Sequence, residues 1–290
     1  MEAATFGQLV RELRKTTRDP RGDRWSRETL SKYIHLTSDQ LGRLERGERK
    51  NLDHQTLNLL AEAFRLTPAE RKEFLVITSG IAGIDLYYKL DPKEQLEKLI
   101  DIAGNFMVPA FIVDAFQDLI AVNQPCLALM GINEERVELA SRQKVGFNNL
   151  HYLYSSALGF KDLLGPLWRG VALLQIYKFR RSSLRFRNHS YFKMLLSELL
   201  KEPQFDVDWY SANRDTLHHY SEYEHFIYEH PIHGNLDYMT TETRIETVYG
   251  ELQLYVHNPY NIETSRVFDK LRQQKGPKLI RLASWPDKKN

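Results

Sequence analysis

Residues 26–47 read SRETLSKYIHLTSDQLGRLERG, and this segment holds two short helical patterns separated by a few residues. Ser26 has the kind of side chain that caps the start of a helix. Leu30, Tyr33 and Ile34 follow at the three- and four-residue spacing of one buried helical face. We therefore expect a first helix that begins after Ser26 and turns these three side chains inward.

The second helical pattern begins at Thr37. Gln40 stands three residues later, which is the spacing of a capping box. In that motif the Thr hydroxyl accepts a hydrogen bond from a free backbone N–H while the Gln side chain reaches back to the cap. Leu41 and Leu44 are expected to be the buried pair of this helix, and Gly47 supplies the left-handed residue that ends it.

Two short helices joined by a tight turn form the helix-turn-helix pattern, in which the second helix offers its first turn to the major groove of DNA. Residues 11–50 carry 12 Lys/Arg against 7 Asp/Glu, so basic side chains are available for the phosphates. We expect base contacts from Thr37, Ser38, Asp39, Gln40 and Arg43, and phosphate contacts from Arg24, Arg27, Arg46, Arg49 and Lys50. A charged helical bundle that binds another protein is the alternative.

The flanking segments predict that these two helices belong to a small all-α domain. Three further helices are expected, with caps at Thr5, at Asp53 or His54, and at Thr67. The first 80 residues contain 5 aromatic residues and the remaining 210 contain 28, which places a boundary near Ser79 and Gly80. The sequence thus predicts a five-helix domain over residues 1–80.

The N-terminal segment resembles the Cro/repressor-type helix-turn-helix family between Leu30 and Leu66, through residues 41–47 followed by 57–64. It is similar more closely to the MmyB-like transcription regulators, whose long loop before the second helix is matched by residues 16–25. Many members of the wider family carry Gln where this chain has Arg27. The resemblance implies a DNA-binding domain.

Beyond residue 109 the pattern changes to short strands around a helical block. Alternating apolar residues predict two early strands and three late ones, with helical segments from residue 125 to about residue 215 between them. The expected strands are 110–116, 119–123, 220–230, 236–248 and 251–257. This order predicts an α+β domain over residues 109–275 in which helices pack on one side of an antiparallel sheet. Residues 81–108 are expected to form a connecting helical segment, and residues 276–290 a tail.

The same order resembles the PAS-like ligand-binding domain of the MmyB-like family. The residues that carry this resemblance are 109–113, 121–123, 149–150, Phe205, Trp209, His230 and Gly234. It implies a multidomain protein in which a PAS-like sensor domain is joined to a DNA-binding domain.

Composition excludes several other classes. Cys126 is the only cysteine of the 290 residues, which rules out an intramolecular disulfide framework and fits a reducing compartment. The N-terminus lacks a signal-peptide pattern and no apolar run reaches about 18 residues, so we expect a cytoplasmic protein without membrane contact. Phosphate-binding glycine motifs and a nucleophile elbow are absent from the sequence, which argues against an enzyme and against a cofactor.

Six histidines fall among acidic residues between positions 218 and 257, yet their spacing does not favour a metal site. His225 and His230 are one residue further apart than an inverted zinc-protease motif requires, and in a strand they point to opposite faces. No metal is therefore predicted. A metal-dependent enzyme with an N-terminal DNA-binding domain is kept as a rival hypothesis.

A basic segment from Lys178 to Ser197 contains six Lys/Arg and no acidic residue before Glu198. It is open to three interpretations, namely a second nucleic-acid contact, an anion anchor at a pocket mouth, or a solvated basic loop. The residues expected to contact a ligand are Phe111, Val113, Asn123, Trp168, Phe179, Arg180, Arg187, Trp209 and Leu254.

These observations predict a DNA-binding transcription regulator, not an enzyme. Its expected partners are double-stranded DNA, a small lipophilic and fatty-acid-like ligand, and a second copy of the chain. A second copy is expected because two DNA-binding domains on adjacent half-sites bind DNA more tightly than one. The alternative is a constitutive DNA-binding protein whose C-terminal domain only dimerises.

Overall fold

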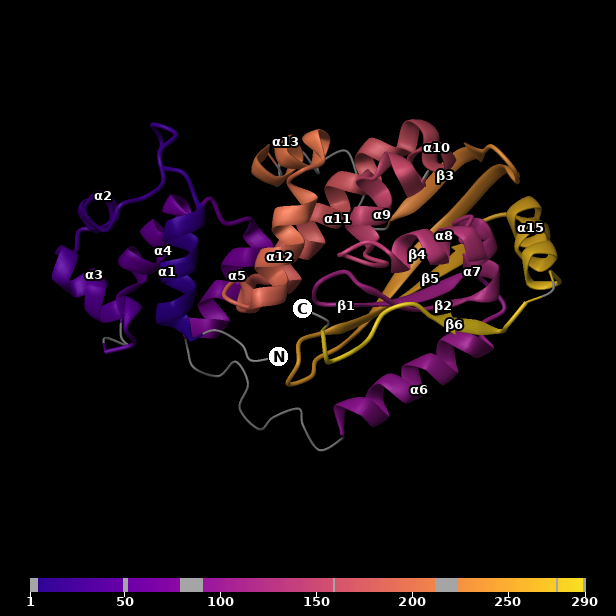
Figure 1. The fold of residues 1–290 in the computed structure, drawn as a ribbon, viewed down its shortest axis with the longest axis horizontal. Coiled ribbons are helices and arrows are strands. Elements are labelled where there is room, and N and C mark those ends of the chain that lie inside the picture. Colours follow the sequence, from indigo (N-terminus) through magenta and orange to yellow (C-terminus); the bar gives the residue numbers. More distant parts are fainter. Residues whose placement is uncertain are drawn as a thin grey trace. The chain divides into compact units, whose positions relative to one another are not determined.

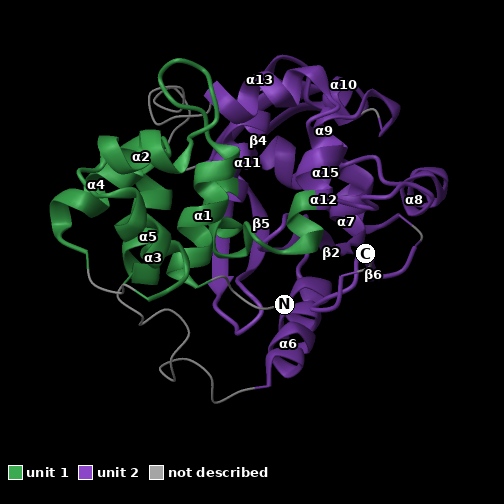
Figure 2. Cartoon of the chain, turned by 60° about the vertical axis from the view of Figure 1, so that its left-hand side comes forward, with its two compact units in different colours: residues 1–86, 180–193 green, residues 87–179, 194–290 purple. Residues whose placement is uncertain are grey.

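The computed structural model describes residues 5–48, 52–78, 91–158, 160–211, 224–274 and 276–288 (Figure 1). The chain divides into two compact units, which are coloured separately in Figure 2. Unit 1 comprises Met1–Leu86 and Arg180–Lys193, and unit 2 comprises Tyr87–Phe179 and Met194–Asn290.

Within residues 5–48 and 52–78, unit 1 contains five helices. They are α1 (Phe6–Thr16), α2 (Arg27–Tyr33), α3 (Ser38–Glu45), α4 (His54–Ala63) and α5 (Pro68–Thr78). The starts of α1, α2 and α3 follow the expected caps, because Thr5, Ser26 and Thr37 each accept a hydrogen bond from the backbone N–H three residues on. Local sequence therefore sets where these helices begin.

The interior of unit 1 is a filled hydrophobic core. Leu30, Leu41 and Leu44 are fully buried, as the three- and four-residue spacing predicts. Trp25 anchors the long loop before α2, since its indole Nε1–H donates to the carbonyl oxygen of Ala63 over 3.1 Å. The loop is thus fixed to the end of α4.

Residues 180–193 fold with the N-terminal helices, which the predicted boundary near residue 80 did not anticipate. Leu184 is fully buried in the core of unit 1, in the short 3₁₀ turn Leu184–Phe186. Lys193 lies 3.2 Å from Glu12 of α1. A segment more than 100 residues away in sequence therefore completes this unit.

The described part of unit 2 contains a six-stranded sheet in the order β3-β4-β5-β1-β2-β6. Its strands are β1 (Ala110–Asp114), β2 (Leu119–Asn123), β3 (His225–His230), β4 (Gly234–Ile245), β5 (Leu252–Pro259) and β6 (Leu279–Arg281). Every neighbouring pair is antiparallel. The antiparallel sheet expected from the sequence is confirmed, although residues 220–223 of the third expected strand lie outside the described part.

Helices cover this sheet on both faces, so the expectation that they pack on one side was incomplete. The described helices after residue 90 are α6 (Pro92–Asn105), α7 (Gln124–Leu129), α8 (Glu134–Ser141), α9 (Asn149–Tyr154), α10 (Phe160–Leu164), α11 (Trp168–Ser182), α12 (Ser190–Leu199), α13 (Pro203–Ser211) and α15 (Ile262–Arg272), of which α11 ends and α12 begins in unit 1. Helix α6 contacts β1 and β2, and Figure 1 shows it across the sheet from α9 and α10. Because both faces of β1 are covered, all five of its residues are buried.

Residues 276–288 are part of the fold and not a free tail. Strand β6 pairs with β2, and Trp285 is buried. Lys288 is 3% exposed and forms ion pairs with Asp114 and Asp118. The end of the described chain is therefore fixed to the sheet.

Candidate functional site

The first turn of α3 is presented to solvent. Thr37, Ser38 and Asp39 are exposed. The Thr37 hydroxyl accepts from the Gln40 backbone N–H over 3.1 Å, and the side-chain Oε1 of Gln40 accepts from the Thr37 backbone N–H over 2.9 Å. Arg43 follows one turn later with 55% of its side chain exposed. The predicted base-contacting residues thus lie on the first two turns of one helix.

The predicted phosphate-contacting arginines are placed differently from one another. Arg46 donates from its Nε to Glu48 over 2.5 Å, and Arg43 lies 3.8 Å from the same carboxylate. Arg27 binds Glu45 over 3.0 Å while half of its side chain stays exposed. Arg24 is exposed, and Arg49 and Lys50 lie outside the described residues.

Glu45 joins three helices, a role that the sequence did not reveal. Its side chain is 2% exposed and accepts from Arg14 of α1 over 2.5 Å as well as from Arg27 of α2. Burial by itself raises the pKa of Glu45, but the hydrogen bonds from both guanidinium groups outweigh it and the pKa is lowered. The carboxylate therefore stays ionised and holds α1, α2 and α3 together.

A second buried carboxylate, Glu70 of α5, is held by the basic segment. Arg180 donates to it over 3.0 and 3.2 Å and Arg187 over 3.2 Å, and Glu70 also caps the Thr67 N–H. Burial raises the pKa of Glu70, and the two arginines reverse this and lower it. Two cations of the basic segment, Arg180 and Arg187, thus hold an internal acid, which none of the three interpretations of this segment included.

Unit 2 contains a pocket between the sheet and its helical cover. Three strands at its floor contribute residues two apart, as expected when alternate side chains share a face, and a fourth strand contributes one residue. These residues are Phe111 of β1, Phe226 and Tyr228 of β3, Tyr238 and Thr240 of β4, and Tyr255 and His257 of β5. Each helix of the cover contributes a pair four apart, namely Asn149 and Leu153, Phe160 and Leu164, and Val171 and Gln175.

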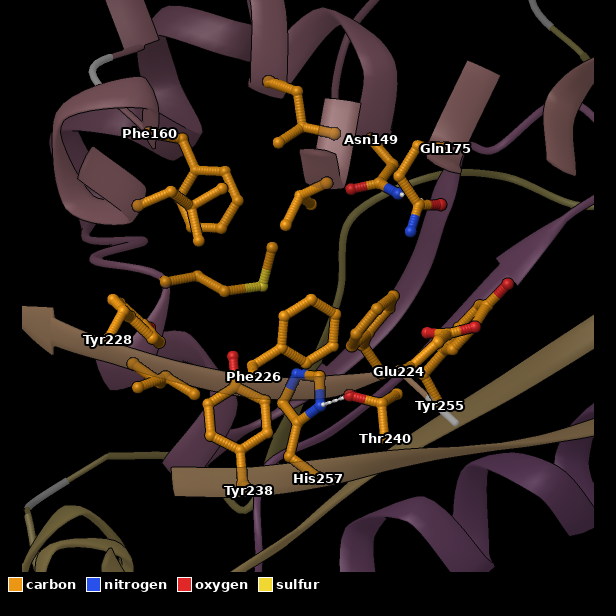
Figure 3. Close-up of a pocket in the computed structure, with 16 residues that line it drawn as sticks. Asn149, Phe160, Gln175, Glu224, Phe226, Tyr228, Tyr238, Thr240, Tyr255 and His257 are labelled. Carbon is orange, nitrogen blue, oxygen red and sulfur yellow. Dashed lines mark hydrogen bonds between the residues drawn. The ribbon is translucent and has the colours of Figure 1, made fainter. Parts of the chain in front are cut away.

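The pocket has an apolar side and a polar side (Figure 3). Phe160 and Tyr228 lie on one side in that view, and Asn149, Gln175 and Glu224 on the other. At the floor of the pocket the rings of Phe111 and Tyr255 stack, with 4.9 Å between their centroids. The lining therefore suits a molecule with one hydrocarbon part and one polar part.

Lys178 stands behind the polar side and is already paired. It is 7% exposed, forms an ion pair with Glu224, and lies 3.2 Å from both Glu242 and the Tyr255 hydroxyl. Burial raises the pKa of Glu242, but Arg244 and Lys178 outweigh this and lower it to about 2. Both carboxylates therefore share the charge of Lys178.

His257 is neutral at the floor of the pocket. Burial, and then the charge of Lys178, lower its pKa to about 3. Its Nδ1 is 2.8 Å from the Thr240 hydroxyl, the hydrogen bond drawn in Figure 3. At neutral pH this ring contributes polarity to the pocket but no charge.

Of the nine residues expected to contact a ligand, Phe111 lines this pocket and the other eight do not. Leu254 is opposite Ile112 in the sheet, on the face away from Phe111 and Tyr255. Val113 packs in the core cluster under α7 and α9. Arg180 and Arg187 are in unit 1 on Glu70, as described above.

The remaining expected ligand residues hold the fold together. Asn123 caps α7 and binds the backbone of Ala110 over 2.9 Å, which fixes β1 to β2. The indole of Trp168 donates to the carbonyl oxygen of Leu153 over 2.6 Å, and the rings of Phe179 and Trp209 pack at 5.7 Å. In this structure these side chains pack and cap, and their contact with a ligand stays a prediction.

An alternating pattern in the sequence marks the pocket residues that were not predicted. Three late strands each place two polar or aromatic residues two apart, at 226 and 228, 238 and 240, and 255 and 257. Such alternation marks one face of a sheet. The register that brings these pairs together, with Phe226 opposite Tyr238 and Thr240 opposite His257, required the structure.

The histidines discussed as metal ligands are separated by the sheet. His225 Nε2 lies 2.6 Å from Asp237, and His230 Nε2 lies 3.1 Å from the carbonyl oxygen of Leu129. Across the described ranges, no cluster of three or more His, Cys, Asp or Glu side chains has the arrangement of a metal site. In the same ranges, no helix has both the length and the apolarity needed to cross a membrane.

Comparison with protein families gives one match. The model of the MmyB-like transcription regulator ligand binding domain matches residues 94–271. This region runs from the first turn of α6 almost to the end of α15 and includes every residue that lines the pocket. A search of curated proteins finds no match to the chain.

Proposed function

The chain belongs to the MmyB-like transcription regulators, and we propose that it binds double-stranded DNA through α3 of unit 1 and a small lipophilic ligand in the pocket of unit 2. The observation that carries the proposal is the pairing, in one chain, of an exposed and capped helical turn with a mainly apolar pocket. A PAS-like fold for unit 2 is supported by its antiparallel sheet and helical cover.

The DNA-binding part rests on the geometry of α2 and α3, which have the lengths and short connection of a helix-turn-helix. Leu41 and Leu44 fix the inner face of α3, so the side chains at 37–39 and Arg43 face outward. A major groove admits one helix, and Arg43 has the reach to bind a guanine edge with two hydrogen bonds. Arg27, held at the start of α2 by Glu45, is placed for a phosphate.

Selection from a pool of random duplexes at low salt tests this part. We expect a sequence to be enriched, and Arg43→Ala to weaken binding to it by about 1 to 3 kcal/mol, the scale of a good base contact. Lys72→Ala is the matched control, since Lys72 is an exposed cation on α5, away from α3. Equal binding by the Arg43 and Lys72 variants contradicts the placement of α3 in the groove.

The ligand-binding part rests on the lining of the pocket, where a few polar groups stand beside a mainly apolar surface, as is typical of small-molecule sites. Leucine, methionine and aromatic side chains make up most of the lining, which fits the hydrocarbon part of a lipophilic ligand. We assign no reaction to the site and therefore propose binding without turnover.

Native mass spectrometry of freshly purified protein tests the ligand-binding part. We expect a species heavier than the chain that releases a small amphiphile on extraction, and a thermal shift when amphiphiles are added back. A chain of bare mass that shows no shift favours the alternative, in which the domain only dimerises.

Helix α11 supplies a route from the pocket to the DNA-binding unit. Val171 and Gln175 of α11 line the pocket, and Arg180 on its last turns binds Glu70 of unit 1. A ligand that favours one position of α11 therefore shifts the equilibrium of the residues that follow it.

A homodimer in the cytoplasm completes the proposal. One small helical DNA-binding domain makes few base contacts. Two such domains on half-sites about one helical turn apart bind more tightly and require a palindromic site. Analytical ultracentrifugation at micromolar concentration is expected to show twice the chain mass, and a selected DNA sequence without two-fold symmetry contradicts this part.

A further inference from the structure

The loop between α1 and α2, residues 17–25, folds as a braced hairpin. Arg18 and Arg24 form an antiparallel bridge across it. The carboxylate of Asp19 is buried and accepts from the backbone N–H of Arg21 over 2.9 Å and from a second backbone N–H, two residues later, over 3.0 Å. An aspartate that binds the backbone of its own turn in this way fixes the shape of the turn.

This hairpin presents arginines to solvent. Arg18, Arg21 and Arg24 are all exposed, whereas the negative charge of Asp19 is turned inward. The bridge places the side chains of Arg18 and Arg24 opposite each other, and like charges in that arrangement destabilise a pair of strands. Within the described part of the chain, Arg21 and Arg24 form no ion pair. A fixed group of cations of this kind indicates an anionic partner.

The base of the hairpin lies beside α3. Trp25, which ends the hairpin, is held by the carbonyl oxygen of Ala63. Arg27 begins α2 two residues later, and its guanidinium is 3.0 Å from Glu45, the last residue of α3. In Figure 1 the hairpin is the indigo loop between α1 and α2, and its tip projects beyond both helices. A duplex that holds α3 in its major groove carries a phosphate backbone on either side of that helix.

We propose that the hairpin binds the phosphate backbone of the duplex that α3 contacts, through Arg18, Arg21 and Arg24. The inference rests on the proposed DNA-binding function and adds to it a contact from outside the two helices. Guanidinium groups bind phosphate oxygens with paired hydrogen bonds. Contacts of this kind release counterions and carry no sequence information, so the hairpin strengthens binding to every duplex alike. Arg43, in contrast, sets the preference among sequences.

The salt dependence of DNA binding tests the inference. Fluorescence anisotropy of the full-length protein gives Kd for the selected duplex and for a scrambled duplex of equal length, between about 50 and 200 mM salt. In a variant with both Arg21→Gln and Arg24→Gln, the slope of log affinity against log salt concentration is expected to be shallower by about 0.9 for each arginine removed. The preference for the selected over the scrambled duplex is expected to stay unchanged.

Three further variants serve as controls. Arg21→Lys with Arg24→Lys keeps both charges and is expected to keep the wild-type slope. Lys72→Gln removes an exposed cation of α5 and is expected to leave both slope and affinity unchanged. Arg43→Ala is expected to lower the preference for the selected duplex. Thermal melting followed by circular dichroism is expected to be the same for wild type and the glutamine variant, because both replaced side chains are exposed.

The outcomes separate this inference from the proposed function. If Arg43→Ala lowers the preference while the glutamine variant keeps the wild-type slope, α3 contacts DNA and the inference about the hairpin is wrong. A slope change in Lys72→Gln as large as that per arginine shows a general effect of charge and also overturns the inference. If the wild-type protein binds no duplex, DNA binding itself is contradicted and the inference falls with it.

Discussion

Unit 1 and unit 2 both bury charged side chains, but they pair them differently. In unit 1 the buried carboxylates of Glu45 and Glu70 each have two arginines, with Glu45 held by Arg14 and Arg27, and Glu70 by Arg180 and Arg187. At the polar side of the pocket in unit 2 each carboxylate has a cation of its own, with Lys178 on Glu224 and Arg244 on Glu242. The difference teaches that one buried acid connects several segments in unit 1, whereas the acids beside the pocket are neutralised one by one.

The largest expected effect comes from removing one of the two buried carboxylates that arginines hold in unit 1. Glu70→Gln leaves Arg180 and Arg187 buried without their carboxylate, and removing one partner of a buried ionic group costs about 3 to 5 kcal/mol of unfolding free energy. Urea unfolding followed by far-ultraviolet circular dichroism measures it.

Glu73→Gln is the control for that variant. Glu73 pairs with Arg185 at the surface of the same helix, with 21% of each side chain exposed, and such pairs contribute about 1 kcal/mol or less. Equal losses of unfolding free energy in the Glu70 and Glu73 variants contradict the distinction between a buried and a more exposed ion pair.

Leu184→Ala sharpens the assignment of residues 180–193 to unit 1. Leu184 is fully buried in the N-terminal core, and truncation of such a leucine costs about 2 to 5 kcal/mol through lost burial and the cavity left behind. Hydrogen exchange is expected to show faster exchange in α1 to α5.

Leu75→Ala is the control for Leu184, because Leu75 is 40% exposed on α5. A Leu184 variant whose extra exchange is confined to unit 2 overturns the assignment of this segment to unit 1.

The third effect is a dependence of stability on pH that originates at the pocket floor. The pKa of His257 falls from an ordinary 6.5 to about 3 in the folded protein, first through burial and then through Lys178. Below pH 6.5 the unfolded chain binds a proton that the native ring does not, so stability is full above this pH and is lost as pH falls.

Replacement of His257 by Asn tests that dependence. Between pH 6 and pH 5 the unfolding free energy is expected to fall less steeply in His257→Asn, by about 1.4 kcal/mol per pH unit. The remaining slope includes His151 and His230, whose pKa values burial also lowers. Identical slopes in both proteins show that His257 is protonated in the native state.

The smallest expected effect is the counterpart of the first. Glu224→Gln is expected to lower the unfolding free energy by less than Glu70→Gln does, because Lys178 retains Glu242 at 3.2 Å. The same urea titration measures it. A loss of unfolding free energy as large as that of Glu70→Gln contradicts this order and indicates that Glu224 stabilises the fold as much as Glu70 does.

The sequence predicted the features that depend on neighbouring residues. The caps at Thr5, Ser26 and Thr37 and the buried pair Leu41 and Leu44 are local, and each was found where its pattern placed it. The alternation of β1, β2, β4 and β5 was equally readable. The ends of β2 agree with the expected ones, and the ends of the other three strands differ from them by at most three residues.

Features that depend on distant contacts were not predictable from the same patterns. Glu70 and Arg180 are 110 residues apart, and nothing in either neighbourhood indicates the other. Strand β6 has three residues, too few to show alternation, and it exists because β2 offers a free edge. Aromatic residues were expected at the pocket, but which of them line it depends on strand register.

The most direct test of the account is the affinity of the selected duplex for protein with and without ligand. Fluorescence anisotropy compares protein stripped of ligand with protein saturated by the amphiphile that binds most tightly in calorimetry. We predict Kd values that differ by at least about fivefold, the low end of typical coupling between two sites. Equal Kd values would contradict a ligand-controlled regulator and leave a constitutive DNA-binding protein.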